Sequence, residues 1–398
     1  MHFTKTVRIF GAAIALSASA TGHVAHADTH PIIIGLDAAL TGGDGQGGVA
    51  IHRGARVAIA EINASGGVLG RPLKIVSRDH RANPARGIDN IDELAVMKDL
   101  VAVIGGVHTP VAMAELKSIH RHKLIYLGPW AAGTPVVANG YKPNFVFRVS
   151  VRDEHAGGFL IGAARDQGYK RPGLLLWRTG WGRSNEKAMN AAMAKISMTS
   201  AGIEWFNSGE KDMSKQIAAL KAKGADVIML VANATDGLVA IRDVAKVAAS
   251  DRLPVISHWG ITGGNFFERG SADITQVKLT FLQTFSFFAP PFPDRAKRVC
   301  AGYCKLFGPC TSVADVRSPV GVAHAYDLVH MLSRAIEETK STDRVKIRAA
   351  LEALPSHRGL MRNYSPPFTA DRHDALDARD FRLSRFNAAG TIVPVEAR

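Results

Sequence analysis

The sequence has 398 residues, of which 46% are hydrophobic and 21% charged, and its formal net charge is +14. The basic residues are spread along the chain with no basic run interleaved with aromatic residues, so we expect no nucleic acid partner. This length exceeds the usual domain size of about 100 to 200 residues, so we expect two lobes.

The first 27 residues have the pattern of a secretory signal peptide. Lys5 and Arg8 precede a short apolar stretch over residues 9–20, and Ala25 and Ala27 form an A-x-A cleavage pattern. The stretch is too short to span a bilayer of about 30 Å as a helix, and no cysteine lies near the cleavage point to accept a lipid. We therefore expect a cleaved chain, free in a bacterial periplasm.

From residue 31 the chain alternates short apolar strands with amphipathic helices, which is typical of an α/β fold. One helix follows "TGGDGQGG", with apolar residues at helical spacing from Ile51 to Ile62, and another covers 318–338. The ending, from Pro366 on, has the pattern of extended strands with turns. The predicted strands are 31–40, 73–79, 101–106 and 124–129 in a first series, and 173–178, 203–208, 226–233 and 254–260 in a second.

The glycine-rich stretch at 41–48 fits a dinucleotide fingerprint by spacing alone. Gly43, Gly45 and Gly48 match G-x-G-x-x-G, but the acid that would hold a ribose should follow about 20 positions later. Asp79 lies 31 residues beyond Gly48, and no P-loop G-K-[ST] is present. We expect no nucleotide and no other cofactor. Because no G-x-S-x-G or H-E-x-x-H pattern occurs either, we do not expect an enzyme.

The three cysteines lie close together at Cys300, Cys304 and Cys310. In an oxidising compartment one disulfide is expected, with Cys310 pairing across the Gly308-Pro309 turn to either Cys300 or Cys304. A metal site is not expected, because no fourth ligand has a suitable spacing.

Several stretches together resemble a known family, the periplasmic solute-binding proteins of the branched-chain amino acid type that serve ABC importers. The segment "GARVAIAEINASGGVLGRPLKIVSRDHRANP" resembles the family's helix, its A-x-x-E-I-N-A-x-G-G turn and the following strand. "VAVIGGVHTPVAMA", "LIYLGPWAAGTP" and "SPVGVAHAYDLVHMLSRAIEE" resemble its third strand, fourth strand and late long helix. The resemblance implies two Rossmann-like lobes joined by three crossovers, with a ligand cleft between them: the type I periplasmic binding protein fold.

The resemblance also implies ligand contacts in the first lobe. In "GGVHTP", His108 and Thr109 take the position that contacts a ligand carboxylate at a helix N-terminus in the family. The alternative is that Thr109 only caps its own helix. After "LGP", Ala131 and Ala132 stand where the family has an Ala-Thr pair, so one hydroxyl is missing unless Thr134 replaces it, and Trp130 stands beside them.

The second lobe departs further from the family pattern. Trp181 replaces a tyrosine that covers the ligand, and Asn233 replaces another aromatic residue. His258 and Trp259 stand near the position of the glutamate that pairs with a ligand ammonium, and the one acid we identified nearby, Asp236, is wrongly spaced. A site that keeps carboxylate donors, loses the ammonium partner and gains indoles favours an aromatic or organic acid over a branched-chain amino acid.

Arg178 and Arg183 are candidates for a second anion contact, the alternative being that both are solvated. Enzymatic and sensory roles are the alternatives to transport. The predicted ligand-binding residues are His108, Thr109, Trp130, Ala131, Ala132, Trp181, Asn233 and Trp259.

We therefore predict the solute-binding component of an ABC importer, a monomer that delivers a small carboxylate to a membrane permease. The predicted division is a signal peptide at 1–27, a first lobe of 28–148 plus about 284–360, and a second lobe of about 149–283 plus 361–398.

Overall fold

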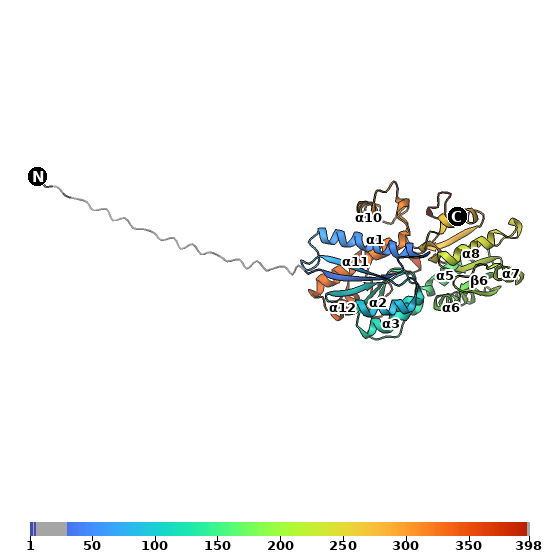
Figure 1. The fold of residues 1–398 in the computed structure, drawn as a ribbon, viewed down its shortest axis with the longest axis horizontal. Coiled ribbons are helices and arrows are strands. Elements are labelled where there is room, and N and C mark those ends of the chain that lie inside the picture. Colours follow the sequence, from blue (N-terminus) through green and yellow to red (C-terminus); the bar gives the residue numbers. More distant parts are fainter. Residues whose placement is uncertain (3, 5–29, 396–398) are drawn as a thin grey trace.

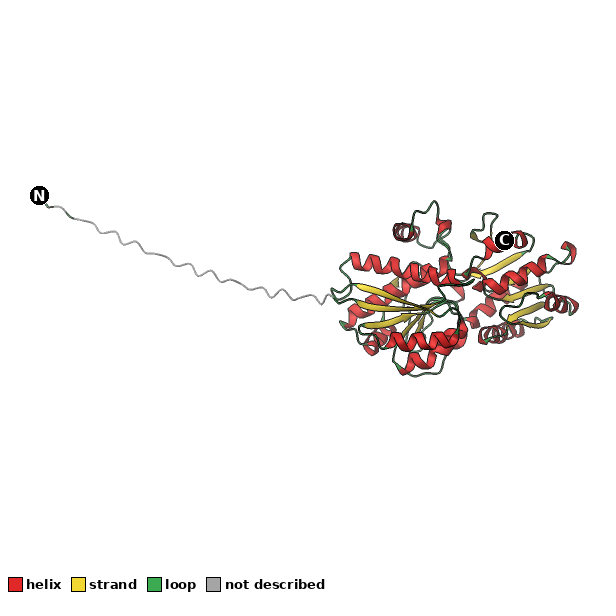
Figure 2. Ribbon diagram, in the orientation of Figure 1, coloured by secondary structure: helices red, strands yellow, loops and turns green. Residues whose placement is uncertain are grey.

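The computed structural model describes residues 1–2, 4 and 30–395, so the signal peptide predicted for 1–27 falls almost wholly outside the described residues. Two large sheets lie in two neighbouring lobes, and each sheet is packed against helices (Figure 1, Figure 2). This confirms the α/β fold with two lobes. Within the described part of the chain, no helix has both the length and the apolar run needed to cross a membrane.

The first lobe is built on a wholly parallel sheet. Helices cover this sheet on both faces, so strands such as β3 are buried along their entire length. The strands, in spatial order, are β2 (Leu73–Asp79), β1 (Ile32–Ala38), β3 (Leu100–Ile104), β4 (Ile125–Gly128) and β5 (Val146–Arg148). The helices are α1 (Gly45–Ala64), α2 (Pro84–Ala95), α3 (Thr109–Arg121), α4 (Thr134–Val137), α10 (Pro293–Phe307), α11 (Pro319–Thr339) and α12 (Arg344–Ala353), with a 3-10 turn η3 (Val313–Asp315).

The second lobe has a mixed sheet in which two antiparallel strands extend a parallel core. Its strands, in spatial order, are β14 (Ile392–Pro394), β13 (Arg382–Phe386), β10 (Leu279–Gln283), β9 (Val255–Ser257), β8 (Val227–Val231), β6 (Pro172–Trp177) and β7 (Gly202–Phe206). Its helices are α5 (Asp153–Asp166), α6 (Gly180–Lys195), α7 (Ser214–Ala222), α8 (Ala234–Ala245) and α9 (Phe266–Ile274), with 3-10 turns η1 (Ala249–Asp251), η2 (Trp259–Gly263) and η4 (Ala378–Asp380).

The glycine-rich stretch forms the turn after β1 and the first turn of α1. The predicted apolar face of α1, from Ile51 to Ile62, is buried. Further along α1, a Cβ at Gly54 would lie only 2.2 Å from the carbonyl oxygen of Val322 in α11. Only glycine allows this close approach, so α1 and α11 pack tightly and hold the N-terminus of α1 in place.

The chain passes between the lobes after β5, after β10 and again before β13. A short hairpin of β11 (His357–Arg358) and β12 (Asn363–Tyr364) precedes the last passage. The Tyr364 hydroxyl donates to Asp327 Oδ2 at 2.7 Å in α11, and buried Arg148 pairs with Asp374. Residues 363–374 therefore contact the first lobe, and the predicted division at about 360 stays a prediction.

Candidate functional site

The strand-end loops of the two lobes meet face to face. We call this region the interlobe zone: loops 39–44, 105–108 and 129–133 of the first lobe, and loops 178–179, 232–233 and 258–264 of the second. Asp44 accepts hydrogen bonds across it from the Thr235 backbone N–H (3.0 Å) and hydroxyl (3.1 Å). A Cβ at Gly264 would lie 2.5 Å from the carbonyl oxygen of Gly43. The lobes are thus in direct contact, and small residues make this contact possible.

Helices α1, α3, α6 and α8 all begin at the interlobe zone. Each helix N-terminus presents backbone N–H groups and a partial positive charge. Ligands of open α/β sheets bind outside the carboxyl ends of the strands, which is where these termini lie. The interlobe zone therefore combines the expected position of a ligand with an environment that favours negative charge.

All eight predicted ligand-binding residues lie in the interlobe zone or in the first turn of a helix that begins there. None of them exposes more than 4% of its surface. Asn233 is the N-cap residue of α8, but its side chain makes no capping hydrogen bond. Whether these residues contact a ligand stays a prediction.

Three indoles dominate the apolar surface of the interlobe zone. The rings of Trp130 and Trp259, from opposite lobes, lie 5.5 Å apart between centroids at 44°. Trp181 packs edge-on against His258 at 5.1 Å. The Trp130 indole Nε1 is buried and has no hydrogen-bond partner among the described residues.

Thr109 does not cap its own helix. Its hydroxyl oxygen accepts a hydrogen bond from the Gly133 N–H at 3.1 Å and so joins α3 to the 129–133 loop. Its neighbour His108 is buried, with Nε2 at 3.7 Å from Asp44 Oδ2 and with Nδ1 lacking a partner among the described residues. Burial raises the pKa of Asp44, but the nearby His108 and the hydrogen bonds from Thr235 outweigh burial and hold this pKa below its ordinary value.

Buried Arg148 holds the 129–133 loop from behind. Its Nη1 donates to the carbonyl oxygens of Ala131 (3.1 Å) and Gly133 (2.9 Å), while its Nε donates to Asp374. The same guanidinium therefore fixes a predicted ligand loop and the third crossing between the lobes.

Asp153 is a feature of the site that the sequence-based prediction missed. It is fully buried at the start of α5, and its Oδ1 accepts hydrogen bonds from Trp181 Nε1 (3.2 Å) and His258 Nε2 (3.1 Å). Its backbone N–H donates to the Ala132 carbonyl at 2.9 Å. Asp236, the acid considered from the sequence, instead accepts from the Gly209 N–H at 2.9 Å. An acid directly after the first crossing was the sequence signal that could have identified Asp153.

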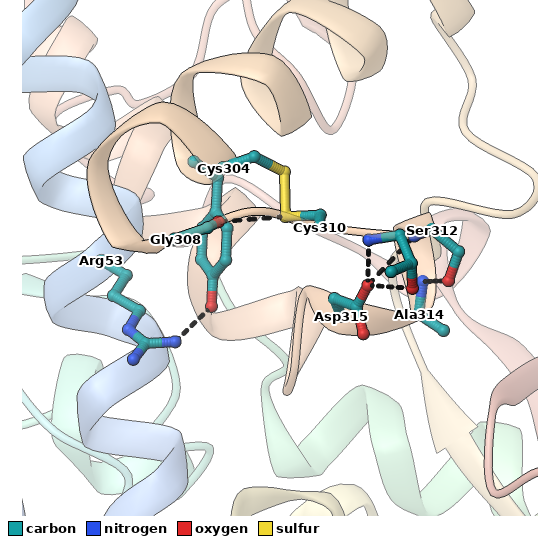
Figure 3. The surroundings of a disulfide bond; sticks show 9 residues. Arg53, Cys304, Gly308, Cys310, Ser312, Ala314 and Asp315 are labelled. Atoms are coloured by element: carbon teal, nitrogen blue, oxygen red, sulfur yellow. Dashed lines mark hydrogen bonds between the residues drawn. A yellow bond between two sulfur atoms is a disulfide. The ribbon is translucent and has the colours of Figure 1, made fainter.

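Two further predictions concern Arg178 and Arg183 and the disulfide. Arg178 and Arg183 are exposed and lie over the Trp205 ring, at 5.8 and 5.5 Å from its centroid, which favours the solvated alternative. The disulfide joins Cys304 to Cys310 beside α1 and leaves Cys300 free (Figure 3). No group of three or more His, Cys, Asp or Glu side chains is placed to hold a metal ion within the described ranges.

Two α/β lobes that meet through their strand-end loops define the class of bilobed periplasmic binding proteins. Residues 31–391 match the family described as periplasmic binding protein, and the chain belongs to this family. Solved structures show the type I fold: a periplasmic binding protein type 1 from Bordetella pertussis (TM-score 0.82, 22% identity) is similar over 92% of this chain and 100% of its own.

The family resemblance to branched-chain amino acid binding proteins of ABC transporters is also confirmed. A Leu/Ile/Val-binding protein homolog of Brucella melitensis is 26% identical over 59% of this chain and 65% of its own length, so the match spans less than two thirds of that relative. A Streptococcus pneumoniae branched-chain amino acid binding protein solved with isoleucine (TM-score 0.78, 18% identity) is similar over 92% of this chain and 100% of its own. An R. palustris ABC transporter binding protein solved with 4-hydroxybenzoate (TM-score 0.78, 18% identity) is similar over 93% of this chain and 96% of its own.

Proposed function

We propose that this protein is the periplasmic solute-binding component of an ABC importer and that it captures a small aromatic or organic carboxylate by closing its lobes. The observation that carries the proposal is the set of three buried indoles, Trp130, Trp181 and Trp259, at the strand ends of both lobes. Indoles supply large apolar faces for a planar ligand at a low entropic cost. The ligand is then delivered to a membrane permease, and no chemical step is needed.

The polar atoms beside the indoles support a carboxylate ligand. His108 Nδ1 and Trp130 Nε1 are buried without partners among the described residues, and α3 begins at the same place. Buried polar groups normally have hydrogen-bond partners, so a ligand carboxylate that accepts from these groups would satisfy them. The R. palustris protein solved with 4-hydroxybenzoate has the same fold and supports this ligand class by analogy.

Alanine substitutions of the indoles test the proposal. We expect Trp259→Ala and Trp181→Ala to weaken binding of the best aromatic acid by about 10- to 100-fold, because each removes a large stacking surface. Isothermal titration calorimetry measures the affinity. Trp205→Ala is the matched control, because Trp205 lies on the edge strand β7 under Arg178 and Arg183 and is not a predicted ligand-binding residue, and we expect it to bind as the unmodified protein does. If Trp259→Ala and Trp181→Ala both bind the acid with unchanged affinity, the proposal that indoles line the ligand site is wrong.

A further inference from the structure

Asp153 is a buried carboxylate with one satisfied oxygen and one unsatisfied oxygen. Its Oδ1 accepts the two hydrogen bonds from Trp181 and His258, whereas Oδ2 is buried and has no hydrogen-bond partner among the described residues. Two other acids near the interlobe zone, Asp44 and Asp236, each accept from backbone N–H groups and have no oxygen of this kind. Asp153 alone among the three presents an available acceptor.

The described partners of Asp153 carry no positive charge. His258 Nδ1 accepts a hydrogen bond from the Trp259 backbone N–H at 2.9 Å, so Nδ1 bears no proton. The ring proton is therefore on Nε2, which donates to Asp153, and the imidazole is neutral. The indole of Trp181 is neutral as well. Within the described chain His258 is the sole ion-pair candidate within 4 Å of Asp153, so this buried carboxylate lacks a counter-charge.

Asp153 is bonded to predicted or neighbouring residues of the interlobe zone in both lobes. Its backbone is bonded to Ala132 of the first lobe, and its side chain is bonded to Trp181 and His258 of the second. A ligand held between the indoles would contact the same three residues. An uncompensated charge in such a place is costly unless an opposite charge arrives with the ligand.

We propose that Asp153 is a specificity-determining residue whose Oδ2 accepts a hydrogen bond from a protonated amine on the ligand. The preferred ligand is then an aromatic zwitterion, with its carboxylate at His108 and Trp130 and its ammonium at Asp153. This proposal rests on the proposed function, and it replaces the sequence-based inference that the site has no ammonium partner.

Matched ligand pairs that differ only by the amine test the proposal. One pair is phenylalanine and 3-phenylpropionate, and the other is 4-(aminomethyl)benzoate and 4-methylbenzoate, each titrated calorimetrically at neutral pH. In at least one pair, we expect the unmodified protein to bind the compound that carries the amine about 10- to 100-fold more tightly than the compound that lacks it. We expect Asp153→Asn to abolish this preference while its affinity for the acid without an amine stays equal or rises. The control Asp236→Asn should keep the preference.

The outcomes separate this proposal from the proposed function. If aromatic acids bind but the amine gives no advantage in either pair, the role of Asp153 is overturned and the proposed function stands. If Asp153→Asn weakens both members of a pair equally, Asp153 is structural and the proposal is likewise overturned. If no aromatic acid binds while leucine does, the proposed function fails. Should the variant not fold, as judged by circular dichroism, the preference of the unmodified protein still decides between these outcomes.

Discussion

The side chains in and beside the interlobe zone combine broad apolar faces with a few polar atoms that have no partner among the described residues. Trp130, Trp181 and Trp259 supply the apolar faces, and the polar atoms include His108 Nδ1, Trp130 Nε1 and Asp153 Oδ2. Ligand pockets typically have this character: mostly apolar walls with a small number of polar groups that fix the orientation of the ligand. A donor on one side and an acceptor on the other favour a ligand with two different polar ends.

A pair of buried acidic side chains lies in the core of the first lobe. We expect this pair to affect the stability of the protein rather than ligand binding. Asp37 in β1 and Glu115 in α3 are both buried, and Asn90 donates to Asp37 Oδ1 at 2.7 Å. Burial raises the pKa of Asp37 to about 7, and burial together with the charge of Asp37 raises the pKa of Glu115 well above its ordinary value.

We predict that Asp37→Asn stabilises the protein more at pH 8 than at pH 5. The folded pKa of Asp37 lies above the unfolded value of 3.8, so the folded state holds an extra proton and loses stability as the pH rises through about 7. An amide avoids this loss and still accepts from Asn90. The expected difference in the free energy of unfolding is on the order of 2 kcal/mol, measured by urea unfolding at both pH values. An equal effect at pH 5 and pH 8 would contradict the prediction.

At this scale the resemblance to the family identified candidate site residues, because Trp130 follows "LGP" and Trp181 takes the place of a family tyrosine. Asp153 escaped because its side-chain partners, Trp181 and His258, are 28 and 105 residues away in the chain. Such contacts exist only after both lobes have formed and met. Spacing alone likewise did not decide whether Cys300 or Cys304 pairs with Cys310.

At the scale of elements, the turn between β1 and α1 is a place where the first lobe contacts the second lobe closely. A Cβ at Gly43 would lie 2.3 Å from Thr235 Oγ1 and 3.3 Å from Arg269 Nη1, both in the second lobe. The side chain of Thr235 is itself fixed by its hydrogen bond to Asp44. The absence of a side chain at residue 43 is therefore a condition for the lobes to meet in this arrangement.

We expect Gly43→Ala to weaken ligand binding about tenfold with little change in thermal stability, because the added methyl group obstructs closure without entering either core. Calorimetric titration and a melting curve measure the two effects. Gly158→Ala is the control, since no atom lies within 4 Å of a Cβ at that position in α5. If Gly43→Ala binds as tightly as Gly158→Ala, close contact at this turn is not required for binding.

Most elements were predictable because their patterns are local. The predicted strand at 73–79 coincides with β2, and the apolar runs of the second series coincide with β6 to β9 within two or three residues. Helix α2 ends at Ala95, and the chain then turns through Asp99, which has a positive φ of 64°, before Leu100 begins β3. The contacts of residues 363–374 with the first lobe were not predictable, because they join distant parts of the sequence.

At the scale of the whole molecule, a few polar contacts hold the lobes together away from the indoles. Asp44 bonds Thr235, Thr134 N–H donates to Ser184 Oγ at 3.1 Å, and Arg317 pairs with exposed Glu268. Neutral hydrogen bonds contribute about 1 kcal/mol each and exposed ion pairs about 0 to 1 kcal/mol, so these polar contacts add little to the cost of opening. We expect a ligand that contacts both lobes to shift the population toward the closed form.

A thermal-shift screen of the purified protein tests the central proposal most directly. The panel contains benzoate, 4-hydroxybenzoate, phenylalanine, 3-phenylpropionate, leucine and isoleucine, each at the same concentration. A ligand that binds only the folded state at a hundredfold excess over its Kd stabilises that state by about 2.7 kcal/mol, which raises the melting temperature measurably. We predict that an aromatic carboxylate gives the largest rise. The largest rise with leucine or isoleucine would contradict the assignment of the indole-lined interlobe zone to an aromatic acid.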